Sequence, residues 1–176
     1  AQDMLIQDAI HDRGNWHAKF KDIDGAKADV FLESEAVEQA LFARNLGYAE
    51  LRGSANEYKP YMFIQEFDEA SMSDLALELV DGRLPKQANE VVVSEHIHYN
   101  GGVEIKVGDR LDLAIGQRYS DGYPLGQDDP FSKAGADGDG ETLQPEFTRE
   151  FTVVGIVARP WFEPHSAPGY TVITCL

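Results

Sequence analysis

Five histidines, one cysteine and 31 carboxylates are the side chains that could support catalysis or metal binding in this 176-residue chain. His96 and His98 form an H-x-H pair that could bind zinc on a strand edge, but no third ligand follows at metal-like spacing. The segment DGDGE at 137–141 resembles a fragment of a calcium loop, yet a full loop needs about twelve residues and a bidentate terminal acid. We interpret the histidines as surface residues and the acidic segment as a solvated linker.

Motifs for nucleophiles and for nucleotide binding are absent from the sequence. It contains no G-x-S-x-G, no G-x-G-x-x-G and no Walker-type loop. Cys175 stands in the apolar segment TVITCL, where a buried structural thiol is expected. Carboxylate pairs for glycoside hydrolysis are always available among 31 acids, so they indicate nothing without an aromatic cleft. The sequence predicts no catalytic residue, no metal site and no cofactor.

One aromatic loop is a candidate surface for partner contact. The segment RPWFEPHSAPGY at 159–170 carries Trp161, Phe162 and Tyr170 among three prolines. A rigid aromatic loop of this kind could contact a partner or a membrane surface. The alternative is that these side chains plug the end of a barrel.

The charge balance excludes one class of partner. The chain has 31 acids against 15 bases, a formal net charge of −16. Such a surface repels phosphate backbones, so no nucleic-acid binding is expected. It would suit cationic cargo such as basic peptides. A single cysteine allows no intrachain disulfide, and no apolar run reaches the roughly 18 residues that cross a bilayer.

The elements expected in the first half alternate between helix and strand. Residues 1–13 have helical spacing and start without a cap, as the tail of a longer helix would, and both chain ends look cut. Residues 15–22 alternate like a half-buried strand, and 24–40 predict an irregular helix. Two β-rich runs, 47–52 and 61–67, form a hairpin with a long turn. A short helix follows, with Asp68 or Ser71 as its N-cap.

The second half predicts a central strand and a long hairpin. Residues 91–93 are three valines without polar alternation, which is typical of a strand covered on both faces. Leu111, Leu113 and Ile115 alternate with Asp112 and Ala114, and the apolar segment EFTVVGIVARP is their expected partner strand. Between them lies a long acidic excursion at 119–146, which we expect to be exposed and mobile.

These segments together resemble a known family. The chain resembles the extracytoplasmic, MacB-like periplasmic core domain of FtsX-like ABC transporter permeases. Members show a G-R-x-P turn, here at 82–85, and then an E-[IV]-[VI]-[VIL]-S strand, here at 90–94. A G-D turn and an alternating strand follow, here from 107–109, and a late F-T-V-V-G-I strand matches 151–156. The closing APGYTVIT also fits, whereas the acidic excursion departs from the compact hairpin of many members.

The resemblance implies a fold and a domain order. It implies a mixed α/β (α+β) fold with a stalk helix at 1–13 that extends from a transmembrane segment. A porter-type lobe of βαβ-like units would occupy 14–94, and a more β-rich lobe with the acidic insertion at 119–146 would occupy 95–176.

The resemblance also implies a function. The domain would be non-catalytic, would bind a substrate or partner and would relay ATP-driven motion in export, in lipoprotein or peptide transport, or in peptide resistance. Its partners would be transmembrane helices of the same chain, an ABC ATPase subunit, a second permease copy and an exported or sensed ligand. It would lie on the extracytoplasmic side of a bacterial cell membrane.

Two other classes of function stay open at this point. One is a secreted carbohydrate-active or hydrolytic domain that uses paired carboxylates, and the other is a stand-alone extracellular binding module. Flanking transmembrane helices would separate the permease interpretation from both.

Overall fold

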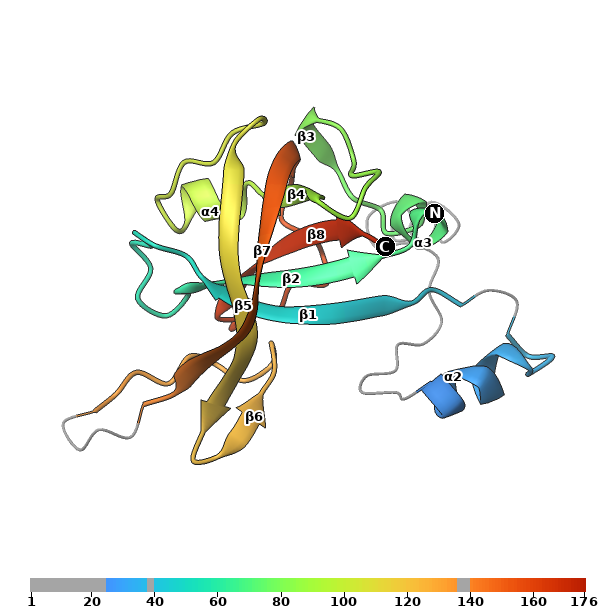
Figure 1. The fold of residues 1–176 in the computed structure, drawn as a ribbon, viewed down its shortest axis with the longest axis horizontal. Coiled ribbons are helices and arrows are strands. Elements are labelled where there is room, and N and C mark those ends of the chain that lie inside the picture. Colours follow the sequence, from blue (N-terminus) through green and yellow to red (C-terminus); the bar gives the residue numbers. More distant parts are fainter. Residues whose placement is uncertain (1–24, 38–39, 136–139) are drawn as a thin grey trace, which may run out of the picture.

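Six β-strands close into a barrel, and two further strands extend its sheet (Figure 1). The computed structural model describes residues 25–37, 40–135 and 140–176. The strands are β1 (Ala43–Glu50), β2 (Tyr61–Phe67), β3 (Leu79–Gly82), β4 (Glu90–Ser94), β5 (Arg110–Ser120), β6 (Tyr123–Leu125), β7 (Thr142–Val157) and β8 (Gly169–Cys175). The described residues also form three short helices, α2 (Gly25–Leu32), α3 (Glu69–Ser73) and α4 (His96–Tyr99).

The long strand β7 closes the barrel. Around the ring the order is β7, β4, β8, β2, β1 and β5, and β5 then pairs with β7 again. Strand β7 has 16 residues; its first part pairs with β5, and its last residues pair with β4 and with the added strand β3. The other added strand, β6, pairs with the end of β5. A closed ring leaves the six barrel strands without the unpaired edges of an open sheet.

The expected mixed α/β fold with a βαβ-like porter-type lobe is wrong, because the described chain is mainly β. The two parallel pairs, β2 with β8 and β4 with β7, join strands far apart in the sequence rather than consecutive ones across a helix. The helix expected at 24–40 includes only the eight residues of α2 among those described. Strands β1, β2 and β4 from 14–94 and strands β5, β7 and β8 from 95–176 belong to the same closed ring, and β4 lies between β7 and β8.

Several local predictions are confirmed. Strands β1 and β2 form the expected antiparallel hairpin. The Asp68 carboxylate caps α3 by accepting a hydrogen bond from the Ser71 amide at 2.6 Å. Strand β4 is buried and lies between β7 and β8, as three consecutive valines indicate. Strand β5 pairs antiparallel with β7 as expected, but residues 111–115 lie opposite 147–151, and most of the expected partner segment 150–160 pairs with β4 and β3 instead.

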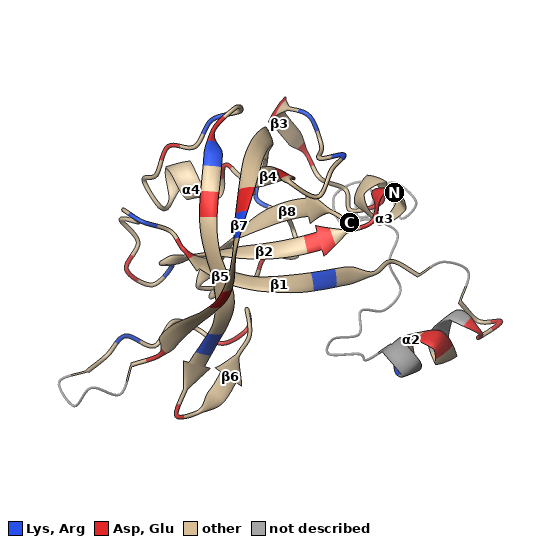
Figure 2. Ribbon diagram, in the orientation of Figure 1, with Lys and Arg blue, Asp and Glu red and all other residues tan. Residues whose placement is uncertain are grey.

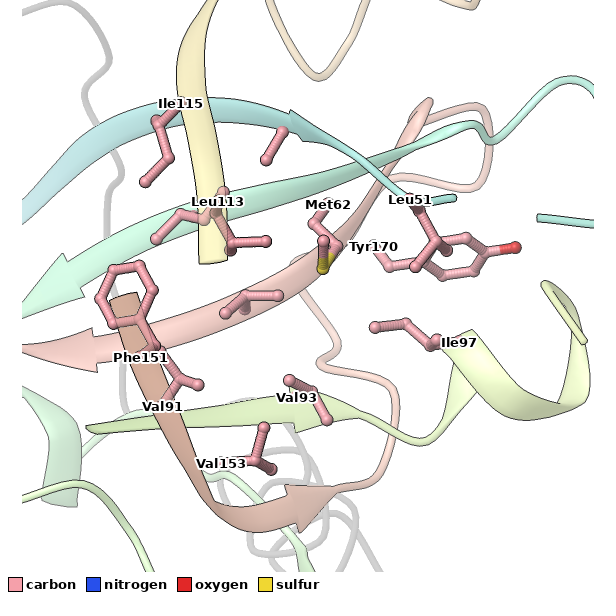
Figure 3. Close-up of a cluster of buried hydrophobic side chains, with 13 residues drawn as sticks. Leu51, Met62, Val91, Val93, Ile97, Leu113, Ile115, Phe151, Val153 and Tyr170 are labelled. Atoms are coloured by element: carbon pink, nitrogen blue, oxygen red, sulfur yellow. The ribbon is translucent and has the colours of Figure 1, made fainter. Parts of the chain in front are cut away.

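The barrel interior is filled by apolar side chains from all six ring strands (Figure 3). Val91 and Val93 of β4, Ile115 of β5 and Phe151 of β7 are almost completely buried there. A smaller cluster around Phe67 and Met72 lies where α3 packs against the other face of the sheet. Alternation along each strand therefore produces an inside and an outside, which is the arrangement that an all-β core requires.

The acidic excursion is attached to the barrel by a buried ion pair. The side chains of Arg118 of β5 and of Glu141 are both fully buried, and the Arg118 Nη2 lies 2.7 Å from the Glu141 Oε2. Arg118 also donates to the carbonyl of Gly126 at 2.9 Å, and the Ser132 amide donates to Glu141 at 2.9 Å. Figure 2 shows acidic residues on strands, helices and connecting loops alike, so the net charge is spread over the molecule.

Two sequence predictions fall outside the described residues. They are the stalk helix at 1–13 and the strand at 15–22. Among the described helices none is long and apolar enough to cross a membrane.

Candidate binding pocket at one end of the barrel

Strand directions bring three connecting segments to one end of the barrel. Strands β2 and β8 run parallel to each other, and β8 runs antiparallel to β4, which is parallel to β7. The starts of β2 and β8 therefore lie at the same end as the finishes of β4 and β7. Lys59 precedes β2, His96 follows β4, Arg159 follows β7 and Glu163 precedes β8. Barrel ends of this kind are common locations for ligand sites.

A buried carboxylate, Glu163, is the centre of a polar network at this end. Its Oε1 lies 2.8 Å from the Lys59 Nζ, 3.3 Å from the His96 Nδ1 and 3.4 Å from the Arg159 Nε. Its Oε2 accepts hydrogen bonds from the Thr171 amide at 2.8 Å and the Thr171 hydroxyl at 2.7 Å. Both oxygens are thus satisfied, which is the condition for a stable buried charge.

Burial and charge act in opposite directions on the groups in this network. Burial would raise the pKa of Glu163, but the Lys59 ammonium and the Thr171 hydrogen bonds outweigh it and hold that pKa below its usual value. Burial lowers the pKa of Lys59, and Glu163 offsets only part of this effect. Burial likewise lowers the pKa of His96. The carboxylate is therefore ionised at neutral pH, and His96 is mainly neutral there.

Lys59 and its neighbours are held in fixed positions. The Lys59 ammonium donates to the Ala167 carbonyl at 2.9 Å and lies 4.8 Å from the centroid of the Tyr170 ring. The Tyr170 hydroxyl donates to the Asn100 Oδ1 at 2.7 Å, and the Asn56 side-chain amide donates to the same oxygen at 2.7 Å. The network therefore continues from the ion pairs to two amide side chains.

A pocket of about 260 Å³ opens beside this network. Its lining includes two cationic side chains, two imidazoles and two amides: Lys59, Arg159, His96, His165, Asn56 and Asn100. Tyr58, Ser166 and Ala167 complete it. No aspartate or glutamate of the described residues lines the pocket, so no pair of carboxylates is available there for hydrolytic chemistry. The pocket therefore presents cationic, imidazole and amide side chains to its interior.

The three residues expected to contact a partner lie in different environments. The Trp161 side chain is 40% exposed, and its indole Nε1 donates to the Leu75 carbonyl at 3.4 Å. Phe162 packs against Phe67 with ring centroids 6.4 Å apart. Tyr170 is fully buried beside Lys59. Of the three, only Trp161 presents a large exposed area, and Tyr170 belongs to the pocket network instead.

The other candidates from the sequence lie apart from one another. His96 and His98 lie on the short helix α4, and His96 contacts Glu163. Glu141, at the end of the acidic segment, is buried against Arg118. Cys175 is buried, and burial raises the pKa of its thiol. The described residues contain no group of three or more His, Cys, Asp or Glu side chains that could hold a metal ion.

Sequence reasoning missed the network around Glu163. Lys59 belongs to a segment that was interpreted only as a hairpin turn. Arg159 and Glu163 flank Trp161 and Phe162, and only the aromatic residues of that loop were named as candidates. Lys59 and Glu163 are 104 residues apart, so no local pattern connects them. A signal was nevertheless present, since Glu163 stands directly between Phe162 and Pro164, which are unusual neighbours for a solvated charge.

The comparisons with known proteins do not identify the chain. No protein-family model matches it, and no curated protein is similar to it.

Proposed function

We propose that the chain is a non-catalytic extracytoplasmic domain of an ABC transporter permease of the FtsX-like, MacB type. It binds a substrate or partner and relays ATP-driven motion across the membrane. The observation that most supports this proposal is that the family-like motifs, which are dispersed in the sequence, contact one another in the fold.

The contacts between these motifs are backbone hydrogen bonds. The Arg83 amide of the G-R-x-P turn donates to the Val154 carbonyl in the late strand at 2.9 Å. The Gly108 amide of the G-D turn donates to the Val153 carbonyl at 2.8 Å, and the Val153 amide donates to the Asp109 carbonyl at 2.8 Å. Strand β4, the E-V-V-V-S motif, pairs with the same part of β7. Four segments that resemble the family thus form one structural unit.

Side chains of the motif reinforce the unit. The Arg83 guanidinium forms a two-pronged ion pair with Glu90, with one N–O distance of 2.8 Å. The Lys86 amide donates to the same carboxylate at 2.9 Å. Gly82 has φ of 73°, and a β-carbon there would overlap the Val154 carbonyl. The glycine, the arginine and the glutamate of the G-R-x-P…E motif are therefore explained by their structural roles, without a catalytic role.

The proposal assigns the partners by this resemblance. The domain is connected to transmembrane helices of the same chain and to a second permease copy, and ATP is hydrolysed by a separate ABC ATPase subunit or domain. The proposal rests on the motif unit and does not require the porter-type lobe, which the fold lacks.

The full-length gene product in its host cells tests the proposal. We expect it to sediment with membranes, to resist extraction by carbonate, and to co-purify with an ABC ATPase. Protease added outside spheroplasts should cleave this domain while a cytoplasmic marker stays intact. A product released from cells after signal-peptide cleavage would contradict the proposal, and the stand-alone extracellular binding module would then lead, because the barrel-end pocket suits ligand binding.

A further inference from the structure

We propose that the barrel-end pocket binds a small organic carboxylate, with the anionic group placed beside Arg159, Lys59 and His165. This inference does not depend on the permease proposal. It follows from the charge, the hydrogen-bond donors and the volume of the pocket.

The pocket has an excess of positive charge in a protein with a net charge of −16. Lys59 and Arg159 line it, and the one carboxylate they share is Glu163. The Glu163 side chain is fully buried and both its oxygens are occupied. Two cations against one carboxylate leave one positive charge at the pocket for an incoming anion to neutralise.

Several polar groups of the lining can donate to a ligand, whereas the Nε2 of neutral His96 accepts, because its Nδ1 donates toward the Glu163 carboxylate at 3.3 Å. Arg159 Nη1 lies 3.4 Å from the His165 Nδ1. Since a guanidinium can only donate, this imidazole nitrogen accepts, and the His165 Nε2 therefore carries the hydrogen. Asn100 Oδ1 already accepts from the Tyr170 hydroxyl and the Asn56 amide, so the Asn100 amide nitrogen is the part that can still act, as a donor. Arg159 Nη2 already donates to the carbonyls of Glu163 and Pro164, each at 3.2 Å. A carboxylate is therefore attracted by the charges of Arg159 and Lys59, and it can accept hydrogen bonds from the His165 Nε2 and the Asn100 amide.

The volume distinguishes an organic acid from a bare inorganic ion. The pocket has about 260 Å³, whereas an engineered protein cavity of roughly 150 Å³ holds benzene. A ring or short chain that carries one carboxylate therefore fits. The Tyr58 side chain in the lining, 64% exposed, offers an aromatic surface for its apolar part.

The charge of the whole molecule limits how negative the ligand can be. A net charge of −16 repels anions at long range, and this repulsion grows with each charge the ligand carries. A ligand with a single negative charge is attracted by the pocket cations and suffers the least long-range repulsion from the rest of the protein. The pocket therefore favours a monocarboxylate over a nucleotide or a polyphosphate.

Binding of benzoate to the purified chain, compared with its neutral analogue benzamide, tests the charge requirement. Titration calorimetry and amide chemical-shift mapping at moderate salt supply the measurements. We expect saturable benzoate binding, at least about tenfold tighter than benzamide, with shifts concentrated at the segments before β2 and β8. Equal affinity for the two compounds, or no saturable binding of benzoate or acetate, would overturn the inference.

A matched pair of variants at Ser166 tests the location. Ser166 is exposed and lies in the lining, so substitution leaves the Glu163 network intact. Ser166→Asp adds a carboxylate of almost the same size as the amide added by Ser166→Asn. We expect the aspartate variant to lose about tenfold or more in benzoate affinity and the asparagine variant to keep it. Unchanged affinity in the aspartate variant, with an unfolding temperature like that of the parent, places benzoate elsewhere and overturns the inference.

Discussion

At the scale of single residues, Glu163 is the clearest example of a charge that the fold must satisfy. Its carboxylate is fully buried and contacts Lys59, His96 and Arg159, while Thr171 supplies two further donors. A buried ion pair often adds little net stability over an apolar pair, but removal of one partner leaves an uncompensated charge. The network is therefore sensitive to single substitutions.

We predict that Glu163→Gln lowers the free energy of unfolding by about 3–5 kcal/mol, because a neutral amide leaves the Lys59 ammonium buried without a counter-charge. Urea denaturation at pH 7 measures the change. Glu57→Gln is the control, since Glu57 pairs with Lys133 at 2.7 Å on the surface and exposed pairs contribute little. Equal unfolding midpoints for the two variants would show that the Glu163 network does not stabilise the fold.

The Arg83–Glu90 pair predicts a pH dependence. The Arg83 hydrogen bonds, with the Lys86 amide, lower the pKa of Glu90 to about 2 from its ordinary value of 4.5. A lowered folded-state pKa contributes stability that is fully present above the unfolded-state value and is lost as the carboxylate protonates. We expect the stability difference between the parent and Glu90→Gln to be constant above about pH 4.5 and to shrink toward pH 2.

Denaturant midpoints of both proteins across this pH range supply the measurement. The Arg83→Gln variant should show the same reduced acid dependence, because it removes the main cause of the shift. A stability difference that grows as the pH falls would contradict the assignment.

At the scale of elements, two glycines let three strands approach closely where the barrel closes. Gly47 of β1 and Gly116 of β5 lie at bulges in their ladders, and β1 meets β5 through the pair Tyr48 and Gly116. A β-carbon on Gly116 would overlap the Gln144 carbonyl of β7, and one on Gly47 would overlap the Gly116 carbonyl. Closure of the barrel thus requires glycine at these two positions, because a side chain there would keep the neighbouring strands apart.

We predict that Gly116→Ala destabilises the protein by about 1–3 kcal/mol, because backbone atoms on β7 must move to admit the methyl group. Gly135→Ala is the matched control, since a β-carbon at Gly135 meets no atom within 4 Å. Thermal unfolding of the two variants measures the difference. A Gly116→Ala protein as stable as the control would show that β5 and β7 are not held at this separation.

At the scale of the whole molecule, one buried pair connects the long excursion to the barrel. The side chains of Arg118 and Glu141 are fully buried, and Arg118 lies over the Tyr48 and Tyr61 rings at 5.1 and 5.7 Å from their centroids. We predict that Arg118→Met loosens the excursion, because Glu141 and the carbonyls that Arg118 holds lose their donor. Lys133, the single Lys or Arg within 119–146, then becomes a site of rapid tryptic cleavage.

Limited trypsin digestion with mass spectrometry follows the cleavage after Lys133. Arg110→Met is the control on the same strand, since Arg110 forms an exposed pair with Glu150 at 3.6 Å. Cleavage at the same rate in both variants would show that the excursion is held by other contacts.

The features that could be predicted from the sequence are local ones. The β1–β2 hairpin, the Asp68 cap, the buried strand β4 and the β5–β7 pair follow from alternation, turn residues and capping chemistry, all of which act over a few residues. The fold class was wrong because runs of apolar residues do not specify which strands become neighbours. The expected βαβ-like units join consecutive parallel strands across a helix, whereas the parallel neighbours β2 and β8 are far apart in the sequence.

The ring order, the barrel-end pocket and the partners of the buried charges depend on contacts between segments far apart in the sequence. Lys59 and Glu163 meet because β2 and β8 lie side by side and start at the same end. Arg118 and Glu141 meet because β5 and β7, the two strands that the excursion connects, pair with each other. Lysine, arginine and glutamate are usually solvated, but a buried charged side chain needs an oppositely charged or hydrogen-bonding partner. Which of these side chains become buried depends on closure of the barrel and cannot be read from any one segment.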